Sequence, residues 1–591
     1  MFLDAALQPV MDALSGFLAN NPLVGQWYTA FSRFVFPVLA IWILTASIRS
    51  LLRADVEPET WGYLALPNGD RVPLTHWENI LGRAKSADIV LGYPSISRNH
   101  AALIRAVDGS WAIYDLGSTG GTRVNKLEVD GVAAVEEGQT IELGGVPVVL
   151  LPVPAEARQE QIAERRARSR PASPWGPLVL LTVFQLLTGL QLIVAKGVEL
   201  TALVPGVMLG MMIVEWGYYL TLRVLRRVGF EMETIAFFLS TLSLAVTASS
   251  APDALAKQFG ALVAGLLLFL LLGWFLRDQD RAVRVRPLAV VIAVILFGVT
   301  LVFADSVYGA RNWIRVGGFS FQPSELIKIA FVWAGAATME RLFARRNITL
   351  FILFSGFCLG CFALMSDFGT AAIFFITFLV IAFLRSGDWA TLALICGGTV
   401  FAGMIVLKFK PYIARRFAVW GHAWEFASTT GYQQTRTMSA SASGGLIGVG
   451  AGKGWLHRIA AADTDLVFGM LCEEWGLIIA VLSVLCIVTL AVFAVRACRA
   501  GRGAFYTIAA CAATSLLVFQ TILNVFGAVD LLPLTGVTFP FVSNGGSSML
   551  SAWGLLAFLK AADTRQNASF AIRLPSKREL NGLTSSPREE A

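Results

Sequence analysis

The sequence is poor in charged residues. Aspartate, glutamate, lysine and arginine make up only 15% of the 591 residues, whereas about a quarter is typical of soluble domains. Hydrophobic residues make up 56%. This composition argues against an ordinary soluble protein and indicates a membrane protein.

Cysteine is absent from the first 350 residues, and the seven cysteines that follow lie within or next to apolar segments. Their spacing predicts neither a disulfide framework nor a set of metal ligands, so we interpret each as a small apolar packing residue. Histidine is also scarce. His422 and His457 are the only histidines in the long polar stretch 409–466, too few and too far apart in sequence to predict a metal site.

Lysine and arginine are absent from the first 28 residues. Cytoplasmic loops are enriched in these residues, so we place the N-terminus, which lacks them, outside the cell. We place the C-terminus in the cytoplasm, because a basic segment follows the last apolar stretch. The net charge of +7 reflects this asymmetry and predicts no nucleic-acid partner. If successive apolar segments alternate in direction, one side of the membrane holds the basic segments 49–53, 223–227, 277–286, 341–346, 496–502 and 560–565, together with Arg385.

Apolar stretches of about 17–25 residues, long enough to cross a bilayer, recur along most of the chain. We predict about thirteen transmembrane helices, and therefore a polytopic all-α membrane protein with one inserted domain. The stretches lie near 29–51, 177–195, 200–222, 234–251, 255–276, 287–305, 323–341, 348–366, 369–385, 390–408, 467–496, 505–527 and 546–562.

Ionisable residues stand at the start of one of these helices. The segment GARNWIRVGGFSFQPSELIKIA, residues 309–330, contains Arg311, Glu325 and Lys328. Lipid does not solvate charge, so such residues usually face a partner or a watery cavity that handles a polar substrate. Snorkelling of the side chains to the membrane interface is the alternative.

The same segment resembles the signature of the SEDS family (shape, elongation, division and sporulation), which includes FtsW, RodA and SpoVE. Four further segments match in order and spacing: SDFGTA at 366–371, GYQQTRTMSASASGGLIGVGAGKGWLH at 431–457, DTDLVFGMLCEEWGL at 463–477 and PFVSNGGSS at 540–548. The resemblance covers about residues 230–563. It implies a ten-helix core that polymerises the lipid-linked peptidoglycan precursor, lipid II, outside the membrane.

The polar stretch 409–466 is where we expect the chemistry. It has no helix-length apolar run, and long irregular loops in compact proteins are commonly functional. The reaction joins a sugar hydroxyl to an anomeric carbon while a lipid diphosphate departs. It needs a carboxylate to accept the proton, and positive charge from Lys, Arg or a divalent cation such as Mg²⁺ or Mn²⁺. One base suffices if the anomeric configuration inverts, and no organic cofactor is required.

The resemblance places the catalytic carboxylate at Asp465. The family pattern LPExHTDF corresponds here to IAAADTDL, in which alanines replace the Pro and Glu, and Asp463 replaces the His. Two aspartates this close in sequence also predict mutual repulsion, with one raised pKa, or a shared divalent cation. The alternative is that Asp463 or Asp465 caps the helix whose apolar run starts at Leu466.

Other candidate substrate-binding residues follow from the same chemistry. Arg311 and Lys328 are predicted to bind diphosphate, and Glu325 to pair with one of them. Asp367, which interrupts an apolar run, is interpreted either as a cavity-lining residue or as a helix-turn residue. Lys453 lies in the string GAGKG, where glycines let the backbone approach a phosphate, although the spacing is not that of a P-loop.

Residues 55–155 differ from the rest of the chain. Short alternating runs such as WAIYDL and IELGGVPVVLLPV, separated by Gly, Asp, Asn and Pro, predict an all-β sandwich. Within it, LGRAKSADIVLGYPSISRNHAAL and YDLGSTGGTRVN resemble the forkhead-associated (FHA) domain, a phosphothreonine-binding module. The arginines that flank this domain predict a cytoplasmic location.

The FHA resemblance assigns phosphate recognition to loops on a rigid sheet. Arg83 and Ser97 are the expected phosphate ligands, with Arg98 and Thr119 in support. A guanidinium presents paired donors to phosphate oxygens, and a hydroxyl and backbone amides complete the cradle.

Two further positions of this domain bear on peptide binding. His100 is expected to buttress the binding loop, as in the family. Gly120 replaces the asparagine that normally holds the backbone of the bound peptide. A purely structural FHA fold is therefore the alternative to a phosphopeptide-binding one.

Together these features predict an FHA-tethered SEDS peptidoglycan glycosyltransferase of a bacterial plasma membrane, acting in elongation, division or sporulation. A lipid II flippase or transporter, and a catalytically inactive scaffold, are the competing functions. The implied partners are a class B penicillin-binding protein and, through the FHA domain, a phosphothreonine protein and a Ser/Thr kinase. The expected parts are an N-terminal region with one membrane anchor (1–54), the FHA domain (55–155), a basic linker (156–176), two extra membrane helices (177–228), the polymerase core (229–563) and a disordered cytoplasmic tail (564–591).

Overall fold

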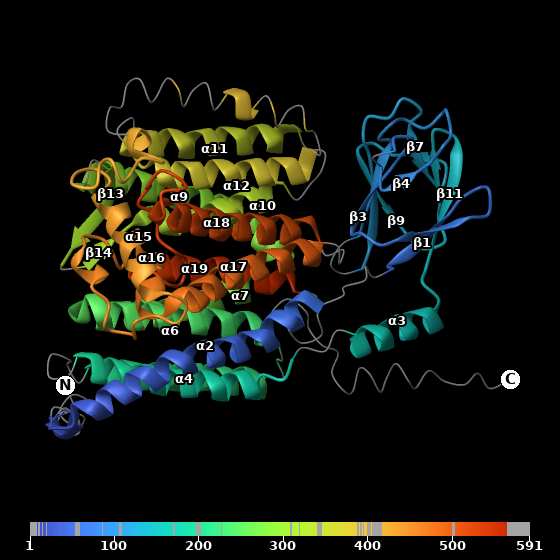
Figure 1. Ribbon diagram of the computed structural model, residues 1–591. Helices are drawn as coiled ribbons and strands as arrows, with labels where there is room; N and C mark the ends of the chain where they lie inside the picture. The colour runs from blue at the N-terminus through green and yellow to red at the C-terminus, as the bar shows by residue number, and fades with distance from the viewer. Residues whose placement is uncertain are drawn as a thin grey trace.

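The structure is a computed structural model in which a helical bundle and a β domain are distinct parts of the chain (Figure 1). The helical bundle holds the motifs of the predicted polymerase core. The residues that the structure describes are 20–53, 60–85, 87–105, 109–168, 172–196, 203–225, 229–307, 310–317, 319–339, 345–386, 416–498 and 503–563, with isolated positions at 9, 12–14, 16–18, 227, 389, 393, 395–398 and 404.

Eight of the described helices are long and apolar enough to cross a membrane. The predicted multi-pass helical protein is therefore confirmed, while the predicted tail and nearly all of the span at 390–408 lie outside the described residues. The eight are α2 (Pro22–Arg53), α4 (Trp175–Lys196), α5 (Leu203–Val224), α6 (Glu231–Ser250), α7 (Leu255–Phe275), α9 (Arg286–Phe303), α17 (Gly476–Cys498) and α18 (Ala504–Ala528). The other helices of the bundle that correspond to predicted apolar stretches are α10 (Pro323–Thr338), α11 (Arg345–Met365), α12 (Phe368–Ser386) and α19 (Gly546–Ala562).

The apolar run at 467–496 was wrongly predicted as one span, because it forms two helices. The first, α16 (Val467–Glu474), ends at Trp475, and α17 follows from Gly476. Gly476 has a φ of +86°, a conformation that glycine adopts at little cost. A Cβ at this position would collide with the backbone of Gly448, so a loop from elsewhere in the core packs into the break.

The stretch 409–466 is also more regular than predicted. Its described part contains α15 (Tyr432–Gly444), which packs against α16. Gly444 lets the two helices approach closely, since a Cβ there would collide with the backbone of Cys472.

A small three-stranded sheet precedes α10 and was not predicted from the sequence. Its strands are β12 (Asp305–Val307), β13 (Ala310–Val316) and β14 (Phe319–Phe321), in that order in the sheet. This sheet carries Arg311 at the end of the bundle where α15 and α16 also lie (Figure 1).

The β domain is a sandwich of two sheets, as predicted. Its hydrophobic core draws only on residues between Leu64 and Leu150, and among the described residues it shares no member with the helical core. One sheet has the order β2-β1-β11-β10-β7-β8 and the other β4-β3-β5-β6-β9. The strands are β1 (Gly62–Ala65), β2 (Arg71–Leu74), β3 (Glu78–Gly82), β4 (Ile89–Val90), β5 (Ala101–Arg105), β6 (Trp111–Asp115), β7 (Thr122–Val124), β8 (Leu127–Glu128), β9 (Val132–Val135), β10 (Thr140–Leu143) and β11 (Val146–Leu151).

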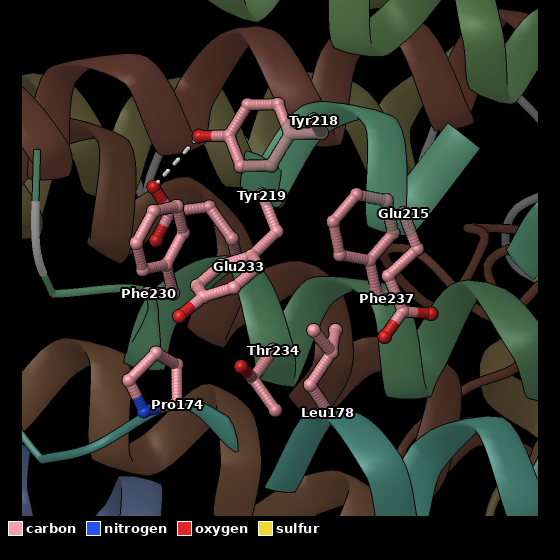
Figure 2. Close-up of a pocket in the computed structure, with 9 residues that line it drawn as sticks. All are labelled: Pro174, Leu178, Glu215, Tyr218, Tyr219, Phe230, Glu233, Thr234 and Phe237. Atoms are coloured by element: carbon pink, nitrogen blue, oxygen red, sulfur yellow. Dashed lines mark hydrogen bonds between the residues drawn. The ribbon is translucent and has the colours of Figure 1, made fainter. Parts of the chain in front are cut away.

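Buried ionisable groups join α5, α6 and α19. The Nζ of Lys560 lies 2.9 and 3.0 Å from the two carboxylate oxygens of Glu233, and it also donates to the carbonyl of Gly229. Tyr218 Oη donates to Glu233 at 2.9 Å, beside a pocket that extends to Glu215 (Figure 2). Lys560 and Glu233 are 2% and 1% exposed, so water does not screen the pair.

Replacing Lys560 with methionine should destabilise the protein. The substitution leaves the Glu233 carboxylate buried without its cation, and breaking a buried pair in this way costs about 3–5 kcal/mol in the free energy of unfolding. Denaturation of the purified protein in detergent measures the effect. The double variant Lys560→Met/Glu233→Gln removes both charges and should recover most of the loss. Equal stability of the single and double variants would contradict this account.

Candidate functional site

Asp463 and Asp465 lie in the turn-rich segment that precedes α16. The N-cap residue of α16 is Leu466, which makes no side-chain capping bond. Neither aspartate therefore occupies the cap position, and the helix-capping interpretation was wrong.

Asp463 connects α6 with the segment before α19. Its Oδ2 accepts hydrogen bonds from Asn544 Nδ2 at 2.7 Å and from Ser250 Oγ at 3.1 Å. Its carbonyl oxygen accepts the Asn544 amide at 2.8 Å. These hydrogen bonds make Asp463 part of the contact between α6 and the segment before α19.

Asp465 lies where its own segment meets α18 and the loop 531–545. Its carbonyl oxygen accepts Asn524 Nδ2 at 3.0 Å, and the same amide group donates to the Val537 carbonyl at 2.8 Å. Gly536 has a φ of +71°, and a Cβ there would lie only 3.2 Å from Asp465 Oδ2. The backbone of Asp465 is thus fixed, and its carboxylate lies against a bare stretch of backbone.

Burial raises the pKa of Asp465 to about 6. The Thr464 hydroxyl and the Arg416 guanidinium lower the pKa, while the Asp463 carboxylate contributes a smaller increase. Repulsion between the two aspartates was predicted as the cause, but burial is the larger effect. A carboxylate with this pKa is ionised at neutral pH and is a better proton acceptor than an ordinary aspartate.

Two carboxylates for which we predicted no role hold the glycine loop, residues 448–454, and the two residues that follow it. Glu473 accepts the amides of Trp455 and Leu456 at 2.8 and 3.0 Å. Glu474 accepts the amide of Gly452 at 2.9 Å. Two adjacent acids inside an apolar run were the signal that such buried acceptors exist.

Lys453 projects from this loop with an exposed side chain. Partial burial, and then the guanidinium of Arg33 on α2, lower the pKa of Lys453. Positive charge from two distant segments of the chain therefore gathers at the glycine loop.

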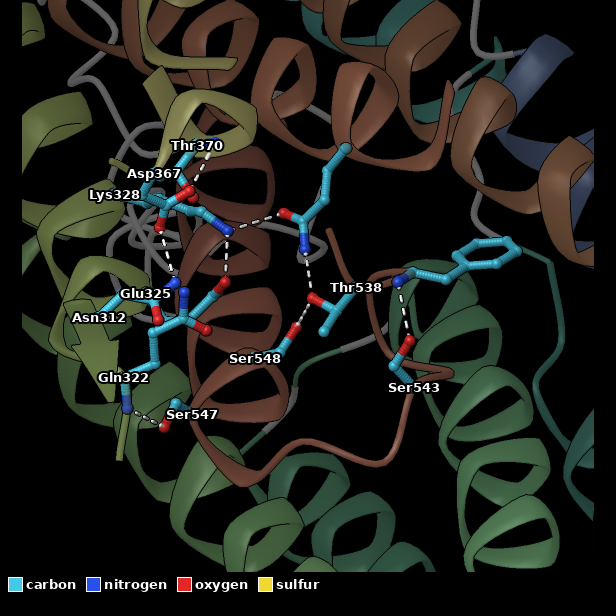
Figure 3. A network of polar contacts seen from close by, with 12 residues as sticks. Asn312, Gln322, Glu325, Lys328, Asp367, Thr370, Thr538, Ser543, Ser547 and Ser548 are labelled. Carbon is cyan, nitrogen blue, oxygen red and sulfur yellow. Dashed lines mark hydrogen bonds and ion pairs between the residues drawn. The ribbon is translucent and has the colours of Figure 1, made fainter. Parts of the chain in front are cut away.

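Lys328 and Glu325 form a buried pair within α10. Lys328 Nζ lies 2.7 Å from Glu325 Oε1 and donates to Gln520 Oε1 at 2.9 Å. Gln520 donates to Thr538 Oγ1 at 2.8 Å, and Thr538 is hydrogen-bonded to Ser548 at the same distance (Figure 3). The two ionised side chains are 1% and 5% exposed, so they do not snorkel to an interface. The network passes through Thr538 of loop 531–545, which also contacts Asp465, and ends at Ser548 on α19.

Asp367 and Arg311 lie in different surroundings from this pair. Asp367 immediately precedes α12, and its Oδ1 accepts the Thr370 amide at 3.1 Å, the geometry of a helix cap. Its Oδ2 accepts Asn312 Nδ2 at 3.0 Å (Figure 3). Arg311, next to Asn312 on β13, is exposed, whereas Lys328 is buried. The helix-turn interpretation of Asp367 thus fits better than the cavity-lining one.

The expected phosphate ligands lie on adjacent loops of the β domain. The Ser97 carbonyl accepts the Arg83 amide at 3.0 Å, and Ser97 Oγ accepts the Thr119 amide at 3.0 Å. The Arg98 carbonyl accepts the amide of Ala84 at 3.0 Å. Arg83, Arg98 and Thr119 are exposed, and Ser97 is half-buried. The fold therefore brings together the backbone of these four positions and leaves their side chains accessible.

Two acceptors shape these loops, the buried His100 and the half-buried Asp115. His100 Nδ1 accepts the Ser97 amide at 3.1 Å, which leaves the proton on Nε2, 3.1 Å from the Gly121 carbonyl oxygen. Asp115 was not singled out from the sequence, yet it accepts four hydrogen bonds from residues 117–122. Burial raises the pKa of Asp115, but these bonds outweigh it and the pKa is lowered overall.

Gly120 has a steric reason to be glycine. A Cβ there would lie 2.7 Å from Gly144 Cα and 3.1 Å from the Ser95 carbonyl oxygen. The loop therefore packs more tightly against its neighbours than an asparagine at this position would allow.

Comparison with known proteins identifies both parts of the chain. The sequence profile of the FtsW, RodA and SpoVE family, described as cell cycle protein, matches residues 220–568, more than half of the chain. The chain belongs to this family. The FHA domain profile matches residues 79–144.

Named relatives carry the enzyme class predicted from the sequence. The probable peptidoglycan glycosyltransferase FtsW of Wigglesworthia glossinidia brevipalpis is 29% identical over 320 residues, which cover 50% of this chain and 82% of the relative. The protein of the same name from Moranella endobia (strain PCIT) is 31% identical over 282 residues, 45% of this chain and 73% of the relative. A chain of a solved peptidoglycan synthase complex is 26% identical, with a TM-score of 0.47 over 56% of this chain and 96% of that one.

Restoring the family asparagine at Gly120 should weaken the β domain. Gly120→Asn forces a side chain against the backbone of residues 95 and 144, and overpacking of this kind typically costs about 1–3 kcal/mol. Thermal unfolding of the soluble fragment 55–155 measures the change. Gly92→Asn is the control, because nothing lies within 4 Å of a Cβ there. A Gly120→Asn fragment as stable as the control would show that the loop has room for a side chain.

Proposed function

We propose that the chain is a peptidoglycan glycosyltransferase that polymerises lipid II on the outer face of the plasma membrane, with Asp465 as general base. The observation that carries the proposal is the Asp465 carboxylate itself, which has a pKa raised to about 6 and a backbone fixed by Asn524. Membership of the family supports the reaction class.

The proposed step is a single displacement at the anomeric carbon. The acceptor hydroxyl oxygen forms a bond to that carbon, and its proton moves to Asp465. The bond from the carbon to the diphosphate oxygen breaks, and the electron pair leaves with the diphosphate. Alignment of the attacking and leaving oxygens inverts the configuration, so one base is enough.

The leaving diphosphate needs positive charge. Lys328 is paired with Glu325, so we assign it to holding loop 531–545 rather than to the diphosphate. Arg311 and Lys453 are exposed and remain the proposed diphosphate ligands.

The carboxylates at this site are poorly suited to bind a divalent cation. Asp463 and Asp465 would be its ligands, but Asp463 Oδ2 already accepts two hydrogen bonds. Across the described part of the chain, no three His, Cys, Asp or Glu side chains come together as a metal site. We therefore derive no step through a cation.

The arrangement across the membrane is part of the proposal. We place the FHA domain and the C-terminus in the cytoplasm, and the N-terminus and the segment with Asp465 outside, with about thirteen spans in total. The distribution of Lys and Arg supports this orientation. Glycan synthesis and phosphopeptide binding would then occur on opposite sides of the membrane.

The proposed partners follow from the two halves of the chain. A class B penicillin-binding protein would crosslink the polymer, and a solved relative belongs to a complex described as coordinating polymerisation and crosslinking. The FHA domain would recruit a protein phosphorylated on threonine by a Ser/Thr kinase, through Arg83 and Ser97 with Arg98 and Thr119. Among the contacts of the described residues, none favours a flippase or an inactive scaffold over this function.

The variant Asp465→Asn should abolish polymerisation while leaving membrane insertion intact. Asparagine keeps the size of the side chain but does not accept the proton, and loss of a general base typically costs about 100- to 10,000-fold in rate. The wild-type rate should also fall as the pH drops below about 6, because the base is then protonated. Polymer formation from purified protein and lipid II measures both effects.

Asp253→Asn is the matched control for this experiment. Asp253 is exposed just after α6, and its substitution should leave the rate unchanged. Polymer yield from Asp465→Asn near that of the control would refute the assignment of Asp465.

Removing the guanidinium of Arg83 should abolish phosphate-dependent binding without unfolding the FHA domain. Hydrogen bonds to charged groups contribute about 1.5–3 kcal/mol each, so Arg83→Ala should weaken phosphothreonine-peptide binding at least about tenfold. Calorimetry on the fragment 55–155 measures the affinity. Arg123→Ala, an exposed arginine on β7, is the control. A wild-type fragment that binds phosphorylated and plain peptides equally would make the domain purely structural.

A further inference from the structure

The apolar helices that precede and follow the β domain in the chain, α2 and α4, lie side by side along the bundle (Figure 1). Both precede residue 220, where the match to the family begins. They nevertheless contact the glycine loop, residues 448–454, which belongs to the family core.

Gln191 of α4 is the centre of this contact. Its side chain is fully buried, and its Nε2 donates to the Ala451 carbonyl at 3.3 Å and to Thr29 Oγ1 at 3.4 Å. Its Oε1 accepts Ser32 Oγ at 3.0 Å. One amide group thus joins α2, α4 and the glycine loop.

Glycine is needed for so close an approach. Gly450 and Gly452 have φ values of +113° and +78°. A Cβ on Gly450 would lie 2.8 Å from Thr29 Cγ2, and one on Gly452 would lie 3.0 Å from Ala195 Cβ. The loop is therefore shaped to fit against these two helices.

The same two helices enclose Trp475, the residue at the break between α16 and α17. Its ring centroid lies 4.8 Å from that of Phe36 on α2 and 5.6 Å from that of Phe184 on α4, to which it is nearly parallel. Phe36 and Phe184 are themselves 5.1 Å apart. The three rings fix the end of α16 from the side where α2 and α4 lie.

From the glycine loop the hydrogen bonds lead on to Asp463. The Gly452 amide donates to Glu474 Oε2 at 2.9 Å, and Glu474 Oε1 accepts Ser249 Oγ at 2.6 Å. The next residue of α6, Ser250, donates to Asp463 Oδ2 at 3.1 Å. Asp465 follows two residues later in the chain.

We propose that α2 and α4 position the segment that carries Asp463 and Asp465, with Gln191 as the positioning residue. This inference rests on the proposed function, because the group being positioned is the proposed base. Glu473 and Glu474 hold the glycine loop from the core side, and α2 and α4 hold it from the other side. Displacing a base by about 1 Å lowers the rate about 100-fold. The support from α2 and α4 would therefore affect catalysis as well as stability.

The two helices are also held to α6 at the ends from which the chain leads to the β domain. Ser50 Oγ, near the end of α2, and the amide of Ala172, just before α4, donate to the same Glu231 oxygen at 2.5 and 3.0 Å. Ser32 and Ser50 are about 27 Å apart along α2, at 1.5 Å per residue. The pair therefore connects the attachment points of the FHA domain to the glycine loop.

Gln191→Leu in the full-length protein tests the inference, because leucine fills the space of the amide but makes none of its hydrogen bonds. We expect kcat for lipid II polymerisation to fall about 10- to 100-fold with little change in KM. Amide hydrogen exchange of residues 448–456 should become faster, while exchange in α18 stays the same. Ser32→Ala, which removes only one of these bonds, should give a smaller effect of the same kind.

Thr188→Val is the matched control. Thr188 is buried one turn earlier on α4, and its hydroxyl has no hydrogen-bond partner among the described residues. If Gln191→Leu matches this control in kcat or in exchange, the inference is overturned. If Asp465→Asn still polymerises lipid II, the proposed base is wrong, and the exchange measurement still decides whether α4 holds the loop.

Discussion

The carboxylate of Glu474 joins separate parts of the helical core. It accepts hydrogen bonds from Ser249 at the end of α6 and from the amide of Gly452 in the glycine loop. The residue that follows it, Trp475, is enclosed by aromatic rings of α2 and α4. A buried acid has to take its hydrogen bonds from the protein, since a lost donor leaves an unsatisfied polar group that water does not reach. The position of the glycine loop follows from that requirement.

The same requirement acts on the other side of the proposed site. The pair of Lys328 and Glu325 needs further partners, and Gln520 and Thr538 extend it to the loop that contacts Asp465. Lipid does not solvate polar side chains, so those inside a membrane bundle usually pair with one another. The segment with Asp465 is thus constrained through α18 on one side and through α6 on the other.

How far the sequence predicts this structure depends on the range of the interactions involved. Apolar runs and alternating strands predicted the membrane helices and the β sandwich, because local periodicity encodes both. Motif resemblance singled out Asp465 but not the residues that support it. The break at Gly476 was missed, since its backbone conformation depends on a loop more than 20 residues earlier in the chain. Gln191 gave no signal at all, because an amide side chain in an apolar helix does not identify its partner.

The two ends of the FHA insertion meet at one point. The amide of Ala172 lies 3.2 Å from the hydroxyl of Ser50, so the chain leaves the bundle and returns to it at nearly the same place. Joining two ends that are already in contact requires no rearrangement of the helices, and the entropy of the intervening loop grows only slowly with its length. The packing of α2 against α4 therefore sets no limit on the length of the chain inserted between them, which could be a whole domain or a short turn.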